Sequence, residues 1–292
     1  MSRGVWNGLL VLDKPGGVTS RDAVNRVQRR LPRGTRIGHT GTLDPLATGV
    51  LVLCLSNTTR LAEYVQRMDK TYRTTLLLGA TSDTDDADGT VTAVEGARMP
   101  TPDEIAGAVK AFVGPVEQTP PAFSAVKVTG RRAYDLARRG ADVALAAKTV
   151  HIYGIDVLGY EPPLLDLEVR CGKGTYVRSL GRDLGARLGC GALVQTLRRL
   201  RVGPFTVDNA VSLEASADEA RARLRPVEEA VAELPTITLA ETELKRLRQG
   251  QAVALAACAG EEIAVFDGRG QLAAVATFDA DRQLLRPAKV LA

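Results

Sequence analysis

The sequence contains few of the residues that build metal centres or disulfides. Its 292 residues include four cysteines and two histidines. The cysteines lie far apart without a CxxC pair, and with the histidines they form no recognisable zinc set. This usage argues against a disulfide-rich secreted domain and predicts a reduced, cytoplasmic protein without a metal.

Long hydrophobic runs are also missing. No apolar run approaches the roughly 20 residues needed to cross a bilayer, and the first residues lack the layout of a signal peptide. A hydrophobic fraction of 45% and a charged fraction of 25% are typical of a soluble globular protein. We therefore expect no membrane association, and the length allows one large domain or two ordinary ones.

Positive charge is in modest excess and unevenly distributed. The formal net charge is +4, and arginine outnumbers lysine, as suits bidentate contacts with phosphate. The arginines gather in three clusters: Arg21, Arg26, Arg29, Arg30, Arg33 and Arg36; Arg131, Arg132, Arg138 and Arg139; and Arg198, Arg199 and Arg201. Such clusters favour a polyanionic partner, although solvated helix faces produce them as well.

The most informative segment is the stretch 38–49, which we call the signature loop. It reads GHTGTLDPLATG, and the apolar run 50–55 that follows predicts a buried strand. Glycines let the backbone approach a ligand closely, and Pro45 stiffens the chain just after Asp44. The loop therefore presents one carboxylate at the end of a core strand, either for chemistry or to satisfy local backbone N–H groups.

The order of these residues resembles the GHTGxLDPLATGxL signature of the TruB family of bacterial tRNA pseudouridine-55 synthases. The resemblance extends in family order over roughly the first 230 residues, through DKP at 13–15, KTYR at 70–73, TPP at 119–121, GKGTYVR at 172–178 and LRR at 197–199. It implies an isomerase that converts uridine to pseudouridine at position 55 in the T loop of tRNA. This reaction involves no redox step and no energy source, so no cofactor is expected.

The resemblance also implies roles for individual residues. Asp44 is the expected nucleophile, and Arg178 is the cation that offsets its desolvation. Tyr72 is expected to stack on the extruded base and to handle a proton. Tyr176 and Leu197 are expected to line the pocket for the base.

Three further residues of the matched segments complete the implied site. His39 is expected to hold the RNA loop open once the target base has left its stack. Lys14 fits either a contact with phosphate or a brace for the signature loop. Phe123 stands where the family's PPxYSAxK element has tyrosine, so an aromatic plane remains and a hydroxyl is lost.

Two unrelated motifs overlap between residues 84 and 95. The run 86–90 spells the DxDGT of aspartyl phosphatases, and 84–95 nearly fits a calcium-binding EF-hand loop. Those sites need a preceding buried strand or flanking helices, whereas this stretch is polar and lies between strand-like patterns. We therefore interpret it as a solvated hairpin turn.

Two other functional classes compete with a stand-alone synthase. One is an RNA-binding or RNA-folding protein in which catalysis is secondary or lost, and the intact Asp44, Tyr72 and Arg178 argue against it. The other is a guide-RNA-dependent pseudouridine synthase that needs partner proteins and carries a larger C-terminal portion. The compact layout favours a monomer that acts on the tRNA T-stem-loop without a protein partner.

Strand and helix patterns interleave without a regular βαβ rhythm. This predicts the α+β class, with a mixed, largely antiparallel sheet flanked by helices, which is also the pseudouridine synthase fold that the resemblance implies. Paired strands are expected at 149–160 and 164–171. Helices are expected over 21–31 (capped by Thr19 or Ser20), 103–113 (opened by a capping box at Thr101), 133–139 and 177–188, with helical sequence over 213–234.

The composition shifts near residue 230 and predicts two domains. Residues 1–234 form the expected catalytic domain, and 235–292 a small β-rich domain similar to the PUA type of RNA-binding module. Within the second, we expect a helix over 241–248 and a hairpin of 262–266 with 272–278. A domain of about 58 residues is near the lower limit for an independent core, so we expect it to pack on the catalytic domain.

Overall fold

The computed structural model describes residues 6–124, 127–128, 131–132 and 145–291. Its centre is a large mixed sheet whose main path, with bounds, runs β14 (Val211–Ser212), β1 (Gly8–Lys14), β3 (Thr48–Leu55), β12 (Ala192–Val202), β4 (Lys70–Leu78), β11 (Leu164–Cys171), β10 (Lys148–Glu161) and β7 (Gly114–Gln118). Two short strands join at its side, β2 (Ile37–His39) on β3 and β13 (Phe205–Thr206) on β12. The neighbours are antiparallel except β1 with β14 and β12 with β3. The predicted mixed, largely antiparallel sheet is confirmed.

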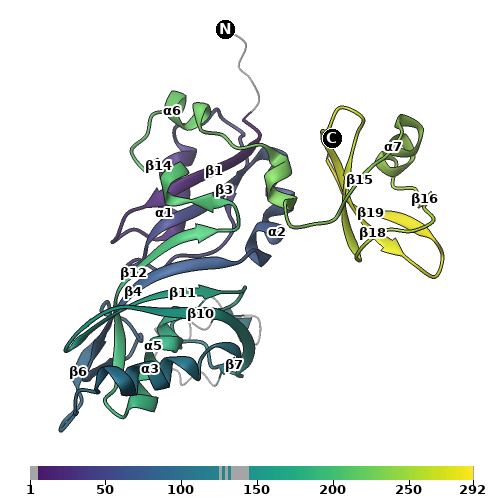
Figure 1. Ribbon diagram of the computed structural model, residues 1–292. Coiled ribbons are helices and arrows are strands. Elements are labelled where there is room, and N and C mark those ends of the chain that lie inside the picture. Colours follow the sequence, from purple (N-terminus) through teal and green to yellow (C-terminus); the bar gives the residue numbers. More distant parts are fainter. Residues whose placement is uncertain (1–5, 125–126, 129–130, 133–144, 292) are drawn as a thin grey trace.

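Helices on one face of this sheet enclose the main core (Figure 1). They are α1 (Ser20–Gln28), α3 (Pro102–Lys110) and α5 (Val177–Leu188), with the short α6 (Ala217–Ala222) near α1. Val24, Ile105 and Leu184 point from the three longer helices into one buried cluster with Leu53 and Leu76 of the sheet. Burying this apolar stripe on each helix is what fixes the helices to the sheet.

The capping signals in the sequence mark the beginnings of two helices correctly. Thr19 caps α1 by accepting a hydrogen bond from the Asp22 amide, and Thr101 forms the predicted capping box with Glu104 at the start of α3. Helix α5 has the predicted bounds and ends at Gly189, which has a φ of +73°. Each of the first two helices ends three residues earlier than expected.

The prediction of helical sequence over 213–234 is largely wrong. Only α6 and a 3₁₀ turn, η3 (Val227–Val231), form there. Between them, the main chain of Arg225 exchanges two hydrogen bonds with Leu9 of β1, at 2.8 and 3.0 Å, and Pro226 follows. Pairing with a strand and a proline without an N–H both interrupt a helix, despite the favourable composition. The helix expected over 133–139 lies outside the described residues.

Smaller elements surround the main sheet. They are the 3₁₀ turns η1 (Ser56–Leu61) and η2 (Val207–Asn209), the helix α2 (Ala62–Arg67), the hairpin of β5 (Ala80–Ser82) with β6 (Val91–Ala93), and the pair β8 (Lys127–Val128) with β9 (Arg131–Arg132). The predicted strand pair 149–160 and 164–171 is confirmed as β10 and β11. No helix in the described ranges is long and apolar enough to cross a bilayer.

The C-terminal part forms a separate five-stranded sheet. Its order is β15 (Thr236–Thr238), β17 (Glu262–Phe266), β18 (Leu272–Asp279), β19 (Leu284–Val290) and β16 (Val253–Ala254), with the helix α7 (Glu241–Arg248) packed on it. The predicted helix over 241–248 and the hairpin of β17 with β18 are confirmed. Figure 1 shows this sheet beside the main domain, next to α2.

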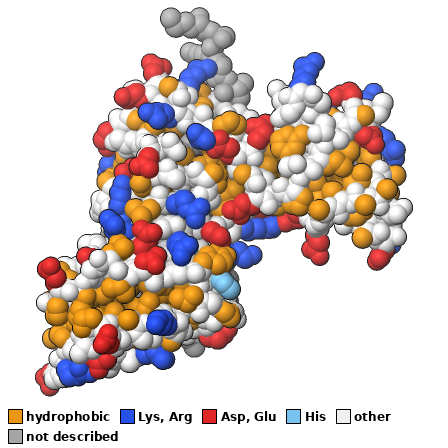
Figure 2. Space-filling view, viewed as in Figure 1, with side chains coloured by type: hydrophobic (Ala, Val, Ile, Leu, Met, Phe, Trp, Pro, Cys, Tyr) orange, Lys and Arg blue, Asp and Glu red, His pale blue; other side chains and the backbone are white. Residues whose placement is uncertain are grey.

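The two parts share a hydrophobic cluster and an ionic contact. Val275 of β18 lies in one buried cluster with Val50 and Val52 of β3. At the rim, Glu262 accepts a hydrogen bond from the Tyr64 hydroxyl at 3.2 Å and pairs with Arg67. Figure 2 shows acidic and basic side chains together where the two parts meet. The C-terminal sheet therefore packs on the main domain, as expected for a domain of its size.

Candidate active site

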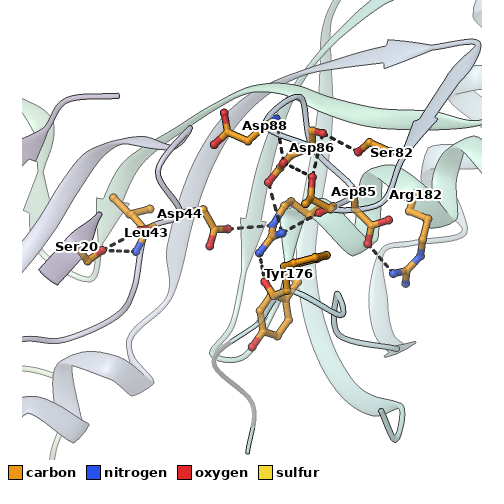
Figure 3. A network of polar contacts seen from close by, with 12 residues as sticks. Ser20, Leu43, Asp44, Ser82, Asp85, Asp86, Asp88, Tyr176 and Arg182 are labelled. Carbon is orange, nitrogen blue, oxygen red and sulfur yellow. Dashed lines mark hydrogen bonds and ion pairs between the residues drawn. The ribbon is translucent and has the colours of Figure 1, made fainter. Parts of the chain in front are cut away.

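The signature loop connects β2 to the buried strand β3, and its backbone is held from two sides. The Ser20 hydroxyl at the start of α1 donates to the Leu43 carbonyl at 2.9 Å and accepts from the Leu43 amide at 2.8 Å (Figure 3). The Gly17 amide donates to the Pro45 carbonyl at 2.9 Å. These contacts fix the main chain on both sides of Asp44.

Strand β12 pairs with β3 directly beside the end of this loop, with Arg199 opposite Gly49. A Cβ atom added to Gly49 would lie 2.2 Å from the Arg199 carbonyl oxygen, and Gly49 has a φ of +97°. Glycine is required here by both the close approach and the left-handed backbone. The buried Arg199 guanidinium in turn donates to the carbonyls of Val50 at 2.7 Å and Gly41 at 3.1 Å.

Asp44 faces Arg178, as the resemblance implies. The Arg178 Nε lies 3.0 Å from the Asp44 carboxylate, and the side chains are 5% and 35% exposed, respectively. Arg178 is placed by the first turn of α5, directly after Tyr176 and Val177. The Asp44 carboxylate therefore contacts a buried cation on one side and remains open to solvent on the other.

A second carboxylate and two carbonyls complete the surroundings of Arg178. Its Nη1 lies 3.4 Å from the Asp86 carboxylate and donates to the Thr84 carbonyl at 2.8 Å. Its Nη2 donates to the Phe123 carbonyl at 2.9 Å. A guanidinium held in a fixed plane by so many acceptors cannot turn away from Asp44 without losing several charge-assisted bonds.

Asp86 is the residue that sequence reasoning missed. The 83–88 loop connects β5 to β6, so the predicted hairpin turn is correct, but the prediction that it is solvated is wrong for Asp86. This side chain is 5% exposed, and its other carboxylate oxygen accepts from the Thr84 hydroxyl at 2.6 Å and the Asp88 amide at 3.1 Å. The density of carboxylates in 83–88 was the available signal, but the sequence pattern favoured a solvated hairpin turn for this stretch.

Burial and one neighbouring charge raise the pKa of Asp44, and two other neighbouring charges lower it. Desolvation raises the pKa of the Asp44 carboxyl, and the neighbouring Asp86 charge raises it further. Arg178 opposes this by Coulombic attraction and hydrogen bonding, and Lys14 adds a smaller lowering effect. The net direction is upward, which makes the ionised carboxylate a stronger base and nucleophile than an exposed aspartate.

Tyr72, Tyr176 and Leu197 converge on the same region. Tyr72 is a buried residue of β4 beside Arg199, and desolvation raises the pKa of its phenol, so the hydroxyl remains protonated near neutral pH. Tyr176 precedes α5, where the Gln118 amide exchanges hydrogen bonds with its backbone at 2.7 and 3.0 Å. Leu197 of β12 packs in the main core with the Tyr72 ring.

Lys14 is fully buried at the end of β1. Its ammonium donates to the carbonyls of Pro15 at 2.8 Å, Val18 at 2.6 Å and Pro45 at 3.4 Å. Desolvation lowers its pKa to about 8, against the attraction of Asp44. This geometry fits the bracing alternative for the signature loop, and contact with RNA phosphate stays a prediction.

His39 and Phe123 are the remaining two residues that the sequence places at the site. His39 is half-buried at the end of β2, opposite Leu53 of β3, and Phe123 is half-buried just before the undescribed residues 125–126. Their expected contacts with RNA stay predictions. The side chains of Arg131, Arg132, Arg138 and Arg139 lie outside the described part of the chain. Among the described residues, no group of three or more His, Cys, Asp and Glu side chains is placed to hold a metal ion.

The arrangement matches a known class of enzyme. A crystal structure of a Cbf5–Nop10–Gar1 complex contains a chain with the same fold, with a TM-score of 0.73 and 24% identity, covering 98% of this chain and 84% of that one. The fold is shared with that chain, and the family model of a TruB pseudouridylate synthase, which matches residues 29–177, makes the class that of the pseudouridine synthases.

Sequence relatives identify the branch of that class. The family model of the TruB family pseudouridylate synthase N-terminal domain matches residues 29–177, and that of the tRNA pseudouridylate synthase B C-terminal domain matches 178–232. The tRNA pseudouridine synthase B of Syntrophobacter fumaroxidans is 48% identical, covering 84% of this chain and 82% of that protein. That of Xanthomonas euvesicatoria is 41% identical, covering 95% and 92%. The chain belongs to the TruB family, and it isomerises uridine to pseudouridine in tRNA.

Proposed function

We propose that the target is the uridine at position 55 in the T loop of tRNA and that Asp44 is the nucleophile. The ion pair between the half-buried Asp44, in the loop that matches the family signature, and the buried Arg178 is the observation that supports this. Asp44 attacks either the sugar C1′ or C6 of the base. In both routes the N1–C1′ bond breaks, the base turns, and a C5–C1′ bond forms while C5 loses a proton and N1 gains one.

The surrounding residues have separate tasks in this mechanism. Arg178 keeps Asp44 ionised, and the Tyr72 ring stacks on the extruded base while its hydroxyl handles a proton. Tyr176 and Leu197 line the pocket and exclude water. His39, within the signature loop, supports the opened RNA loop. Extruding the base costs roughly a few kcal/mol, which these contacts offset in part.

Tritium release from labelled RNA tests the assignment. T-stem-loop transcripts with tritium at uridine C5 are incubated with the protein, with no metal or cofactor added. We expect one tritium released per RNA, and none when cytidine replaces the uridine at position 55. Release from another uridine would move the target, and tight binding without release from any uridine would favour an RNA-binding or RNA-folding protein.

Arginines of α1 and the turn after it are expected to bind the RNA backbone. Arg21, Arg29 and Arg33 are exposed, and within the described ranges they form no ion pair with a carboxylate. Replacing each with alanine is expected to weaken tRNA binding and to lower the salt dependence of log Kd by about 1 per lost phosphate contact. Filter binding at several salt concentrations measures both quantities.

Arg26 supplies the matched control on the same helix. Its guanidinium lies 3.7 Å from Glu214, so part of its charge is already balanced. Arg26→Ala is therefore expected to change the salt dependence less than Arg29→Ala does. Equal slopes for wild type and the Arg21, Arg29 and Arg33 variants would remove α1 from the RNA-binding surface.

We also propose that residues 235–292 form a PUA-like domain that contacts tRNA beyond the T-stem-loop. Its compact five-stranded sheet beside the catalytic domain supports a second contact surface. Full-length tRNA is then expected to bind about tenfold or more tightly than the isolated stem-loop, since linked contacts add avidity. Competition binding measures this ratio, and equal affinities would contradict the assignment.

The enzyme is proposed to act in the cytoplasm as a monomer without a protein partner. The free, largely buried thiols of the described chain suit a reducing compartment. The stronger likeness to tRNA pseudouridine synthase B proteins than to Cbf5 in its complex with Nop10 and Gar1 supports a stand-alone enzyme.

A further inference from the structure

Helix α5 presents two arginines one turn apart, and both hold the same two segments of chain. Arg178 donates to the carbonyls of Thr84 and Phe123. Arg182 forms an ion pair with Asp85 at 2.8 Å and donates to the Thr119 carbonyl at 2.9 Å. Residues four apart lie on one face of a helix, so the two guanidiniums form parallel links to the 83–88 loop and the 119–123 segment.

Asp85 has both an unfavourable backbone conformation and a largely buried carboxyl, and the free-energy cost of each has to be offset by its contacts. Its φ of +62° lies in the left-handed region, and its side chain is only 14% exposed. Burial raises the pKa of the Asp85 carboxyl, and Arg182 is the largest opposing influence, with Arg178 assisting and Asp183 acting against it. The Asp85–Arg182 pair thus stabilises a strained turn in the 83–88 loop.

The strained turn sets the direction of Asp86. The Val194 amide of β12 donates to the Asp85 carbonyl at 3.1 Å, and the Ala87 amide donates to the Val194 carbonyl at 2.9 Å. The main chain on both sides of Asp86 is therefore fixed to β12, while the Asp85 side chain is fixed to α5. Figure 3 shows Asp85 reaching Arg182 and Asp86 lying between Asp85 and Asp44.

We propose that Arg182 is a positioning residue for the reaction: through Asp85 it holds the 83–88 loop against α5, so that Asp86 and Thr84 keep the Arg178 guanidinium beside Asp44. The proposal rests on the proposed role of Asp44 as nucleophile. No described contact joins Arg182 to Asp44, so its influence passes through Arg178. Sequence reasoning assigned Arg182 no function.

The proposal predicts a change in the pH dependence of the reaction. The charged and titratable groups around Asp44 are Arg178 from α5, Asp86 from the 83–88 loop, Lys14 from β1, Tyr72 from β4 and Tyr176 before α5. If the loop loosens, Arg178 stabilises the Asp44 carboxylate less, and the pKa of Asp44 rises. Because the ionised form is the nucleophile, activity is then lost at a higher pH on the acid side.

Single-turnover tritium release measured against pH tests the proposal. Arg182→Met and Asp85→Asn are each expected to lower the rate about tenfold and to move the acid limb to higher pH. The double variant is expected to lose little more than either single variant, because the two residues act as one unit. Arg187→Met, an exposed arginine on the same helix, is the control and keeps the wild-type limb.

Two further variants test whether the charge of the Asp85–Arg182 pair, and not the folding of the chain, causes the effect. Arg182→Lys retains the charge and is expected to leave the acid limb near its wild-type position, and Asp85→Asn serves as the test if Arg182→Met does not fold. The exchange Asp85→Arg with Arg182→Asp is expected to recover part of the rate. An unmoved acid limb in Arg182→Met or Asp85→Asn, or additive losses in the double variant, would overturn the positioning role while the proposed function stands. Failure of the wild type to release tritium, or turnover by Asp44→Ala, would instead overturn the proposed function.

Discussion

Asp44→Ala is expected to lower the single-turnover rate of pseudouridine formation by at least about 10⁴-fold, while tRNA affinity stays within about tenfold. Asp44 is the carboxylate that the signature loop presents to the site, with Arg178 at 3.0 Å behind it. Removing it deletes the proposed nucleophile, whereas the exposed arginines and the aromatic side chains that we propose bind RNA remain. Tritium release and filter binding on the same preparations give the two numbers.

The control for this prediction is another aspartate outside the site. Asp156 is exposed on β10, so Asp156→Ala is expected to leave both rate and affinity unchanged. Equal losses of rate and binding in the Asp44 variant would mean that Asp44 holds the signature loop in shape and does not perform the chemistry. Normal turnover would exclude both roles.

Arg178→Met is expected to lower the rate by about 10³-fold at neutral pH and to move the acid limb of the remaining activity upward. Arg178 is the largest influence that lowers the pKa of Asp44, against desolvation and Asp86, which both raise it. Without the guanidinium the pKa of Asp44 rises further, so a smaller fraction of the enzyme holds an ionised nucleophile at pH 7. Single-turnover rates between about pH 5 and 9 show the shift, since this range covers carboxyls with raised pKa values.

Arg178→Lys separates charge from geometry. An ammonium keeps the positive charge but cannot reach two carboxylates and two carbonyls in one plane. The lysine variant is therefore expected to restore part of the acid limb and little of the maximal rate. If the methionine variant kept the wild-type limb, Arg178 would not be the group that keeps Asp44 ionised.

Local sequence signals singled out the candidate nucleophile but not the contacts that surround it. Asp44 could be found because the glycines, the proline and the buried strand that define its loop are contiguous. The Arg178–Asp86 and Arg182–Asp85 pairs join residues more than ninety positions apart, and only the pairing of the 83–88 loop with β12 brings them together. No local pattern in the sequence records such a contact.

In the fold, too, the elements that depend on local sequence signals were predicted, and those that depend on contacts between distant residues were not. The capping box at Thr101 and the apolar spacing of α5 are local, and the structure follows them. The segment 213–234 has helical composition, yet Arg225 pairs with Leu9 of β1 and breaks the helix. The sequence left two roles open for Lys14, and its burial, with the ammonium enclosed among carbonyls, could be seen only in the fold.

The buried cluster shared by the two sheets connects the C-terminal part to the strand that follows the signature loop. Val275 of the C-terminal sheet packs with Val50 and Val52, the strand residues that directly follow the signature loop. Close-packed interiors transmit a change of even one methylene to their neighbours. A substitution at Val275 is therefore expected to disturb the strand that follows the loop carrying Asp44, although Val275 itself belongs to the C-terminal sheet.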